Sequence, residues 1–93
     1  MYALIQRAAL LRRMNRFDEA VATARMAVAF HRDQARAHHA LGLSLMKVNR
    51  FADAVMSFGE AARLDPKAVD AWINRGVARK ETGDVDGAEA DYR

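Results

Sequence analysis

Apolar and small residues recur along this chain at helical spacing. Five positions in the middle of the sequence fall on one helix face, counting the histidine that begins the series: His38, Leu41, Gly42, Leu45 and Val48. After a break at Asn49-Arg50, a second helical stripe follows: Ala54, Val55, Phe58, Ala61 and Ala62. Asparagine tolerates the left-handed backbone that ends many helices. The pattern therefore predicts two amphipathic helices joined by a short turn within residues 35–68.

This helical hairpin is one period of a repeat. A shift of 34 residues aligns Asn15-Arg16-Phe17 with Asn49-Arg50-Phe51, and a further shift aligns Gly42 with Gly76. No gap is needed across the chain, so the match predicts a repeat architecture. We expect a single module over residues 1–93, divided into repeats 1–34, 35–68 and 69–93, the last incomplete.

The same alignment predicts the remaining helices. The first repeat should form helices near residues 2–14 and 18–31, and Asp33 is a candidate cap for the helix that follows. The third repeat should form a helix near residues 69–82, a turn at Gly83-Asp84 and a second helix that starts near Asp86.

Small residues at one-period spacing predict a close contact between helices. Ala8, Gly42 and Gly76 occupy equivalent mid-helix positions, where glycine costs about 1 kcal/mol relative to alanine. That cost is understandable if two helix axes approach closely there. Phe58 and Tyr92 would supply the bulk on the partner helix.

Composition narrows the class of protein. The 93 residues contain no cysteine, which excludes disulfides, thiolate metal sites and a cysteine nucleophile. No apolar run approaches the roughly 20 residues of a membrane span, and the first residues lack the pattern of a signal peptide. These features predict a cytoplasmic protein. The net charge of +3 is uneven, since residues 1–50 hold nine of the fifteen Lys and Arg but three of the twelve acids.

The repeat resembles the tetratricopeptide repeat family. The resemblance is carried by Ala71-Trp72-Ile73-Asn74-Arg75-Gly76 with Gly83-Asp84, and by Leu41-Gly42, Leu45, Ala54, Phe58, Ala61 and Pro66. It implies an all-α fold in which antiparallel helix-turn-helix repeats of 34 residues stack as a right-handed superhelical solenoid with a concave groove. It also implies binding of proteins or peptides. Arg7, Arg75 and Arg79 depart from the usual apolar residues, and the first repeat is the weakest match.

Helical geometry selects a candidate groove wall on the first helix of each repeat. At 100° per residue, one side of these helices is not required for packing within the hairpin, and equivalent positions align in a stack. The candidate groove residues are Tyr2, Ile5, Arg12, Arg13, Arg36, His39, Leu43, Met46, Lys47, Asp70, Ile73, Val77 and Lys80. An apolar strip flanked by cations suits an extended or helical peptide with apolar and acidic residues.

We therefore expect a protein–protein interaction module that binds a peptide or protein segment in this groove and carries out no catalysis. An alternative is a structural segment that forms homo-oligomers through its incomplete C-terminal repeat, or a regulatory part of a longer protein. Among relatives that hold heat-shock chaperone tails, a Lys and Asn clamp binds the terminal carboxylate. The matching positions here are Ile5, Ala9, Ala40, Asp70 and Asn74. Only Asn74 has a residue type of that clamp, and Asp70 has the wrong charge, so that ligand is disfavoured.

Other chemistries have less support in the sequence. The arginines of the N-terminal half are spread over several faces with few aromatic residues between them. Proteins that bind single-stranded nucleic acid combine cations with aromatic rings that stack on the bases, so a nucleic-acid partner is not expected. His31, His38 and His39 lack the spacing of a helical ligand pair, so no metal or other cofactor is expected. No nucleophile with a partnered base and no glycine-rich phosphate loop is recognisable.

Overall fold

The structure, a computed structural model, describes residues 2–83, with side chains from Ala3 onward. It contains five helices: α1 (Tyr2–Arg13), α2 (Phe17–Phe30), α3 (Ala35–Lys47), α4 (Phe51–Leu64) and α5 (Val69–Glu81). The helices expected near residues 2–14, 18–31 and 69–82 are confirmed to within one residue at each end. The helix expected from Asp86, together with Tyr92, lies outside the described residues.

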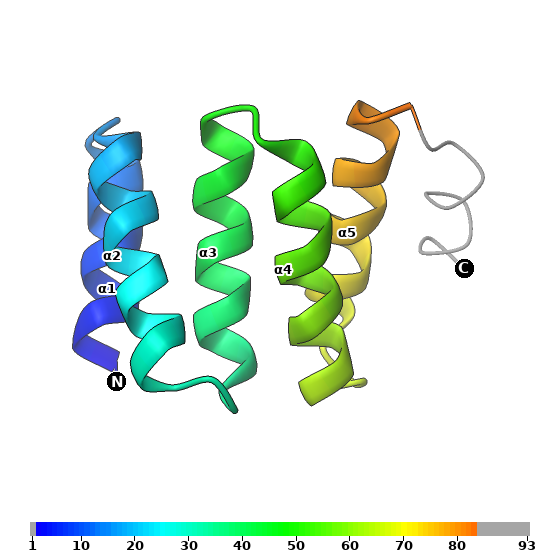
Figure 1. Cartoon of the computed structure of the whole chain (residues 1–93), viewed down its shortest axis with the longest axis horizontal. Coiled ribbons are helices and arrows are strands. Elements are labelled where there is room, and N and C mark those ends of the chain that lie inside the picture. Colours follow the sequence, from blue (N-terminus) through cyan, green and yellow to red (C-terminus); the bar gives the residue numbers. More distant parts are fainter. Residues whose placement is uncertain (1, 84–93) are drawn as a thin grey trace.

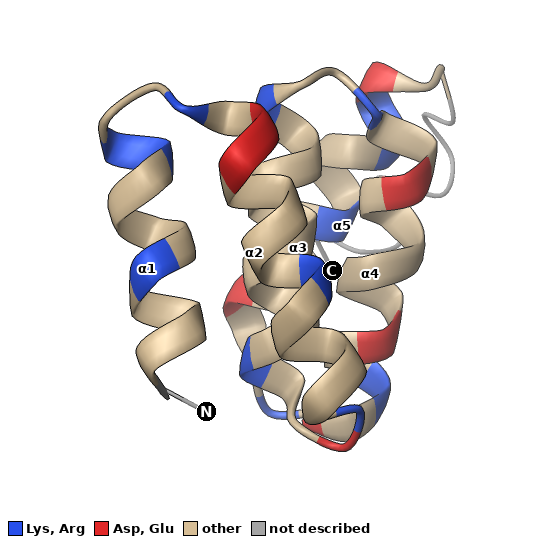
Figure 2. Ribbon diagram, turned by 60° about the vertical axis from the view of Figure 1, so that its left-hand side comes forward, with Lys and Arg blue, Asp and Glu red and all other residues tan. Residues whose placement is uncertain are grey.

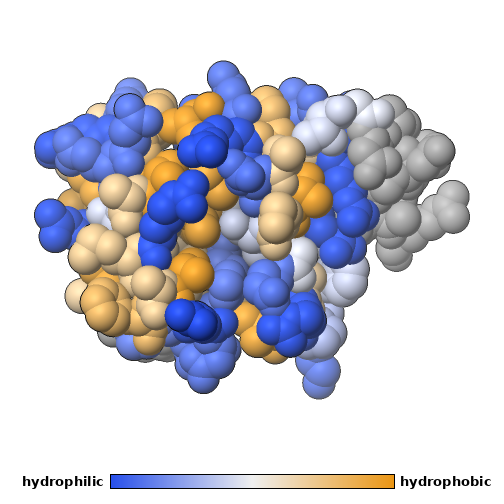
Figure 3. Space-filling view, in the orientation of Figure 1, coloured by the Kyte–Doolittle hydropathy of each residue, from blue (hydrophilic) through white to orange (hydrophobic). Residues whose placement is uncertain are grey.

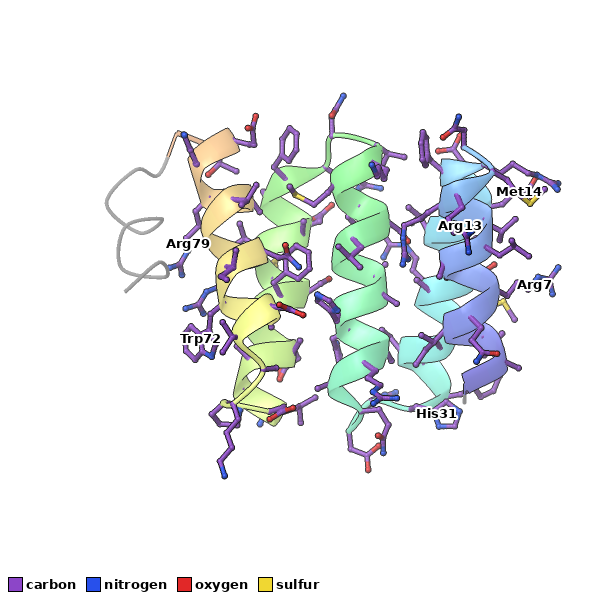
Figure 4. The ribbon with its side chains drawn as sticks, turned by 180° about the vertical axis from the view of Figure 1, so that it is seen from behind. Arg7, Arg13, Met14, His31, Trp72 and Arg79 are labelled. Carbon is purple, nitrogen blue, oxygen red and sulfur yellow. The ribbon has the colours of Figure 1, made fainter. Side chains whose placement is uncertain are left out.

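The helices form two layers (Figures 1 and 4). α1, α3 and α5 lie side by side in one layer, because α3 contacts both of the others. α2 and α4 form the other layer and do not touch each other. This arrangement confirms an all-α helical-repeat solenoid, in which α1–α2 and α3–α4 are antiparallel hairpins and α5 begins the third repeat.

The two hairpin turns have the same backbone geometry. Asn15 and Asn49 have φ angles of 61° and 62°, which are in the left-handed region. The next amide, of Arg16 or Arg50, donates to the carbonyl five residues earlier, at 2.8 Å and 3.0 Å. These are Schellman motifs, which satisfy carbonyls left open at a helix end. The expected role of asparagine at the turn is confirmed.

The expected cap at Asp33 is wrong. The N-cap of α3 is Gln34, and no side chain caps that helix through a hydrogen bond. The α2–α3 connection instead closes through the backbone, where the Gln34 amide donates to the His31 carbonyl at 3.1 Å. The helix consequently starts one residue later than a cap at Asp33 would require.

The core is centred on a contact between α3 and α4. Phe58 is fully buried, and its ring lies against Gly42. A Cβ atom added at Gly42 would lie 2.6–2.8 Å from three carbons of that ring, a distance that real Cβ atoms do not tolerate. The close helix approach expected at Gly42 is therefore confirmed. Around this contact the core contains Leu41, Leu45 and Val21.

The outer face, formed by α2 and α4, is mixed in character. Figure 3 shows apolar and hydrophilic side chains interspersed over it. Its most exposed large apolar residues are Met56, at 74% exposure, and Phe30, at 70%. Within residues 2–83, no helix is both long and apolar enough to span a bilayer.

Candidate functional site

The candidate groove residues belong to α1, α3 and α5, and we call the side of this layer that faces away from α2 and α4 the inner face. Six of them are exposed: Arg13, Arg36, Lys47, Asp70, Ile73 and Lys80. Six are half-buried: Ile5, Arg12, His39, Leu43, Met46 and Val77. The side chain of Tyr2 lies outside the described part. In Figure 4, Arg13 projects from the inner face of α1, whereas Arg7 and Met14 point away from α3 at the edge of the molecule.

Three apolar residues of this set take part in core packing, although the sequence analysis expected this side of the helices to be free. Ile5, Leu43 and Met46 pack against the main core cluster. The expectation considered only the two helices of one hairpin. In the stack, α3 also contacts α1 and α5, so part of the expected free surface of α3 is covered. Ile73, at 43% exposure, is the most accessible apolar side chain of the described candidate groove residues.

Arg12 links α1 to α3. Its Nη1 atom donates to the Ala40 carbonyl at 3.2 Å and to the Ser44 hydroxyl at 3.1 Å. The Ser44 hydroxyl in turn donates to the Ala40 carbonyl at 2.9 Å, and Ser44 is fully buried. Burial lowers the pKa of Arg12. The sequence pattern missed Ala40 and Ser44 as contact residues because neither belongs to the predicted packing face of that helix.

Lys47 is directed towards the start of α2. Its Nζ atom lies 6.0 Å from the centroid of the Phe17 ring, within cation–π range. The remaining exposed cations of the set are Arg13, Arg36 and Lys80. α1 carries arginines and no acidic residue, as the blue bands in Figure 2 show. The positive charge of the inner face therefore lies on all three of its helices.

His39 connects α3 with α5 and α4. The Asn74 amide nitrogen lies 2.9 Å from His39 Nε2, so the amide donates to an unprotonated ring nitrogen. The His39 ring also contacts the Phe58 ring at a centroid distance of 5.6 Å and an interplanar angle of 58°. Burial lowers the pKa of His39; Asp70 opposes this shift and Arg12 adds to it. The neutral imidazole is thus part of the packed structure.

Acid should destabilise the fold through His39. Its folded-state pKa lies below the ordinary value of about 6.5, so below that pH the unfolded chain binds the proton more tightly. The free energy of unfolding should therefore fall as the pH drops from about 7.5 through about 6.5, and level off below the folded-state pKa. Urea unfolding followed by circular dichroism measures this. His39→Gln, which keeps an acceptor for Asn74, should reduce this pH-dependent loss of stability, whereas His31→Gln should not. An equal loss of stability in both variants would contradict the attribution to His39.

A pocket of about 390 Å³ opens where α3 and α5 begin and α4 ends. It brings together three of the candidate residues, Arg36, His39 and Asp70. Its other lining residues were not anticipated: Ala35, Ala61, Asp65, Lys67, Ala68, Val69 and Ala71. A helical pattern does not distinguish an alanine that lines a pocket from one that is packed in the core. Only the three-dimensional arrangement therefore reveals this pocket.

Metal-binding chemistry has no support in the part of the chain that the structure describes. No three His, Asp or Glu side chains of residues 2–83 gather into a possible metal site. His38, one of the three histidines, is buried and its Nε2 lies 2.8 Å from the Arg32 carbonyl. Its burial agrees with its predicted place on the same helix face as Leu41 and Leu45.

Comparison with known proteins agrees with this architecture. Residues 39–93 match the family model of the tetratricopeptide repeat. Protein FlbA of Caulobacter vibrioides is 32% identical over 84 residues, which cover 90% of this chain. The match covers 14% of FlbA, so this chain spans a small part of that curated relative.

Solved structures share the fold at low sequence identity. The second tetratricopeptide domain of Spaghetti (RPAP3), bound to the HSP90 peptide SRMEEVD, has a TM-score of 0.93 and 19% identity, covering 98% of this chain and 84% of that one. MamA from Desulfovibrio magneticus RS-1 has a TM-score of 0.91 and 21% identity, covering 98% and 51%. The type III secretion translocator chaperone SycD of Yersinia enterocolitica has a TM-score of 0.91 and 17% identity, covering 97% and 68%.

Proposed function

Because the chain belongs to the tetratricopeptide repeat family, we propose that its inner face binds a segment of a partner protein. The observation that carries this proposal is the surface of α5 beside α3. Ile73 is 43% exposed there, and Val77 follows one turn later. Exposed cations are present on the same helix, at Lys80, and on α3, at Arg36 and Lys47, so an apolar segment that also bears acidic residues would complement this face.

Two structural neighbours lend this proposal support at the level of the fold. The RPAP3 domain is described with a bound peptide, and SycD is described as a chaperone for translocators. Both therefore engage other polypeptides, on a scaffold that this chain shares. Their identities to this chain are below 20%, so the ligand is not inferred from them.

A heat-shock chaperone tail remains an unfavourable ligand for this face. At the positions that would form the carboxylate clamp, Ala40 is buried, and Asn74 donates its amide to His39. Asp70 adds a negative charge beside them, which repels a carboxylate. Homo-oligomer formation through the last repeat involves residues 84–93, which lie outside the described part, and stays a prediction.

Replacing Ile73 with aspartate should abolish binding at the inner face. The change places a charge on the apolar strip of α5, and loss of an anchor residue typically costs at least about 2 kcal/mol, or about thirtyfold in affinity. A displayed random-peptide library can be selected on the wild-type chain. Fluorescence anisotropy then measures the selected peptides against the variant.

Met56→Asp is the matched control, because Met56 is an exposed apolar residue of α4 on the opposite layer. It should leave peptide affinity within about twofold, and both variants should keep the helical circular dichroism of the parent. If the selected peptides bind Ile73→Asp as well as they bind the parent, or lose affinity for Met56→Asp instead, the inner face is not the binding surface.

A further inference from the structure

The helices meet at a second, smaller cluster that differs in composition from the main core. Ala61, Ala62 and Ala71 are buried there, with Ala35, Ala68 and Trp72 packed around them. The main cluster, by contrast, contains leucine, valine and phenylalanine side chains. A contact built from alanines leaves space, and the pocket of about 390 Å³ lies over this cluster.

The other helix junction closes through similar backbone hydrogen bonds but differs in its side chains. One period earlier, Gln34 stands in place of Ala68 and Ile5 in place of His39. The two connections close alike, since Gln34 donates to the His31 carbonyl at 3.1 Å and Ala68 donates to the Asp65 carbonyl at 3.0 Å. Gln34 and Ala68 are also both N-caps, of α3 and α5. At the α3–α5 junction the small Ala68 lines the pocket at the N-cap position, where the earlier junction has Gln34.

Charges at the rim of the pocket balance. Arg36 and Lys67 contribute two positive charges, and Asp65 and Asp70 two negative ones. One carboxylate oxygen of Asp65 also accepts the Lys67 backbone amide at 3.3 Å. His39, on the same lining, accepts a hydrogen bond from Asn74 and is neutral in that arrangement. A charged side chain would meet no net opposite charge here, while an apolar one would cover the alanine floor.

We propose that this pocket receives a neutral apolar side chain, such as leucine or methionine, from the segment bound on the inner face. The inference rests on the proposed function, since the pocket opens onto that face beside Arg36, His39 and Asp70. It assigns specificity to alanines that the repeat pattern does not distinguish from ordinary core positions. Burial of one such side chain removes enough apolar surface from water to dominate a small interface.

The pocket can be tested with single amino-acid probes, without a known partner. N-acetyl-leucinamide and N-acetyl-methioninamide are titrated into the full chain while the methyl signals of Ala35, Ala61 and Ala71 are followed by NMR. Both probes should shift these signals saturably, and N-acetyl-alaninamide should bind about tenfold more weakly or not measurably. The aspartate and lysine amides should bind no better than the alanine amide.

Two variants separate this proposal from the general one. Ala68→Gln installs the residue that the chain itself carries at the equivalent N-cap, so the fold should persist, and it should weaken leucinamide binding about tenfold. Ile73→Asp lies outside the pocket lining and should leave that binding within about twofold. Equal shifts by all amides, or unchanged binding in Ala68→Gln, would overturn the pocket assignment. The proposed function would still be tested separately, by the peptide-library selection and the Ile73→Asp variant.

Discussion

Replacing Phe58 with alanine should lower the free energy of unfolding by about 3–5 kcal/mol, the usual cost of removing a buried aromatic side chain. Phe58 has no exposed surface, fills the space against Gly42 and contacts the ring of His39. A chain of this length has a total stability of about 5–14 kcal/mol. The substitution should therefore remove a large share of it, measured as a lower urea midpoint in circular dichroism.

Phe30→Ala provides the matched control for this prediction. The same side chain is 70% exposed at the end of α2, so its removal should change the free energy of unfolding by no more than about 0.5 kcal/mol. If the two substitutions were equally costly, Phe58 would not be the centre of the α3–α4 contact.

Replacing Gly42 with alanine should also destabilise the protein, although alanine is the better helix former. The gain in helix propensity is about 1 kcal/mol. This gain is opposed by a clash of the new Cβ with the Phe58 ring, whose three nearest carbons would lie 2.6–2.8 Å away before relaxation. The ring is fully buried and cannot move into solvent, so overpacking of about 1–3 kcal/mol should outweigh the gain. Thermal and urea unfolding report the net loss.

The control is Gly59, a glycine of α4 with a looser environment. An added Cβ there would lie 3.7 Å from two atoms of the flexible Arg75 side chain, which is an ordinary contact. Gly59→Ala should consequently stabilise the protein by about 0.5–1 kcal/mol. Combining Gly42→Ala with Phe58→Leu should cost less than the sum of the single changes, with a coupling of about 0.5–3 kcal/mol. Simple additivity would show that the clash is not the cause.

The hairpins were predictable because their signals are local in sequence. The spacing of Leu41, Leu45 and Phe58 defined the helices, and Asn15 and Asn49 marked turns whose left-handed backbone the structure confirms. Gly42 was informative because a glycine in mid-helix is costly unless something approaches it. Each of these inferences concerns a contact or turn within one hairpin.

The candidate site was less predictable because it depends on contacts between repeats. Helical periodicity could not show that Arg12 reaches the Ala40 carbonyl, or that Leu43 packs partly against the core. Those contacts involve small or polar residues, such as Ser44, that are buried without a hydrophobic signal. The pocket escaped prediction for the same reason, since its lining comes from two repeats and four of its ten residues are alanines.

The order of the helices also bears on how quickly the chain folds. Among α1–α5, every contact joins a helix to its neighbour or next neighbour along the chain. No distant segments have to find each other, so the loss of chain entropy before favourable contacts form is small. Helical proteins with such local contacts fold within about microseconds to milliseconds. Each hairpin can act as a starting point, and the next helix then adds to a surface that is already in place.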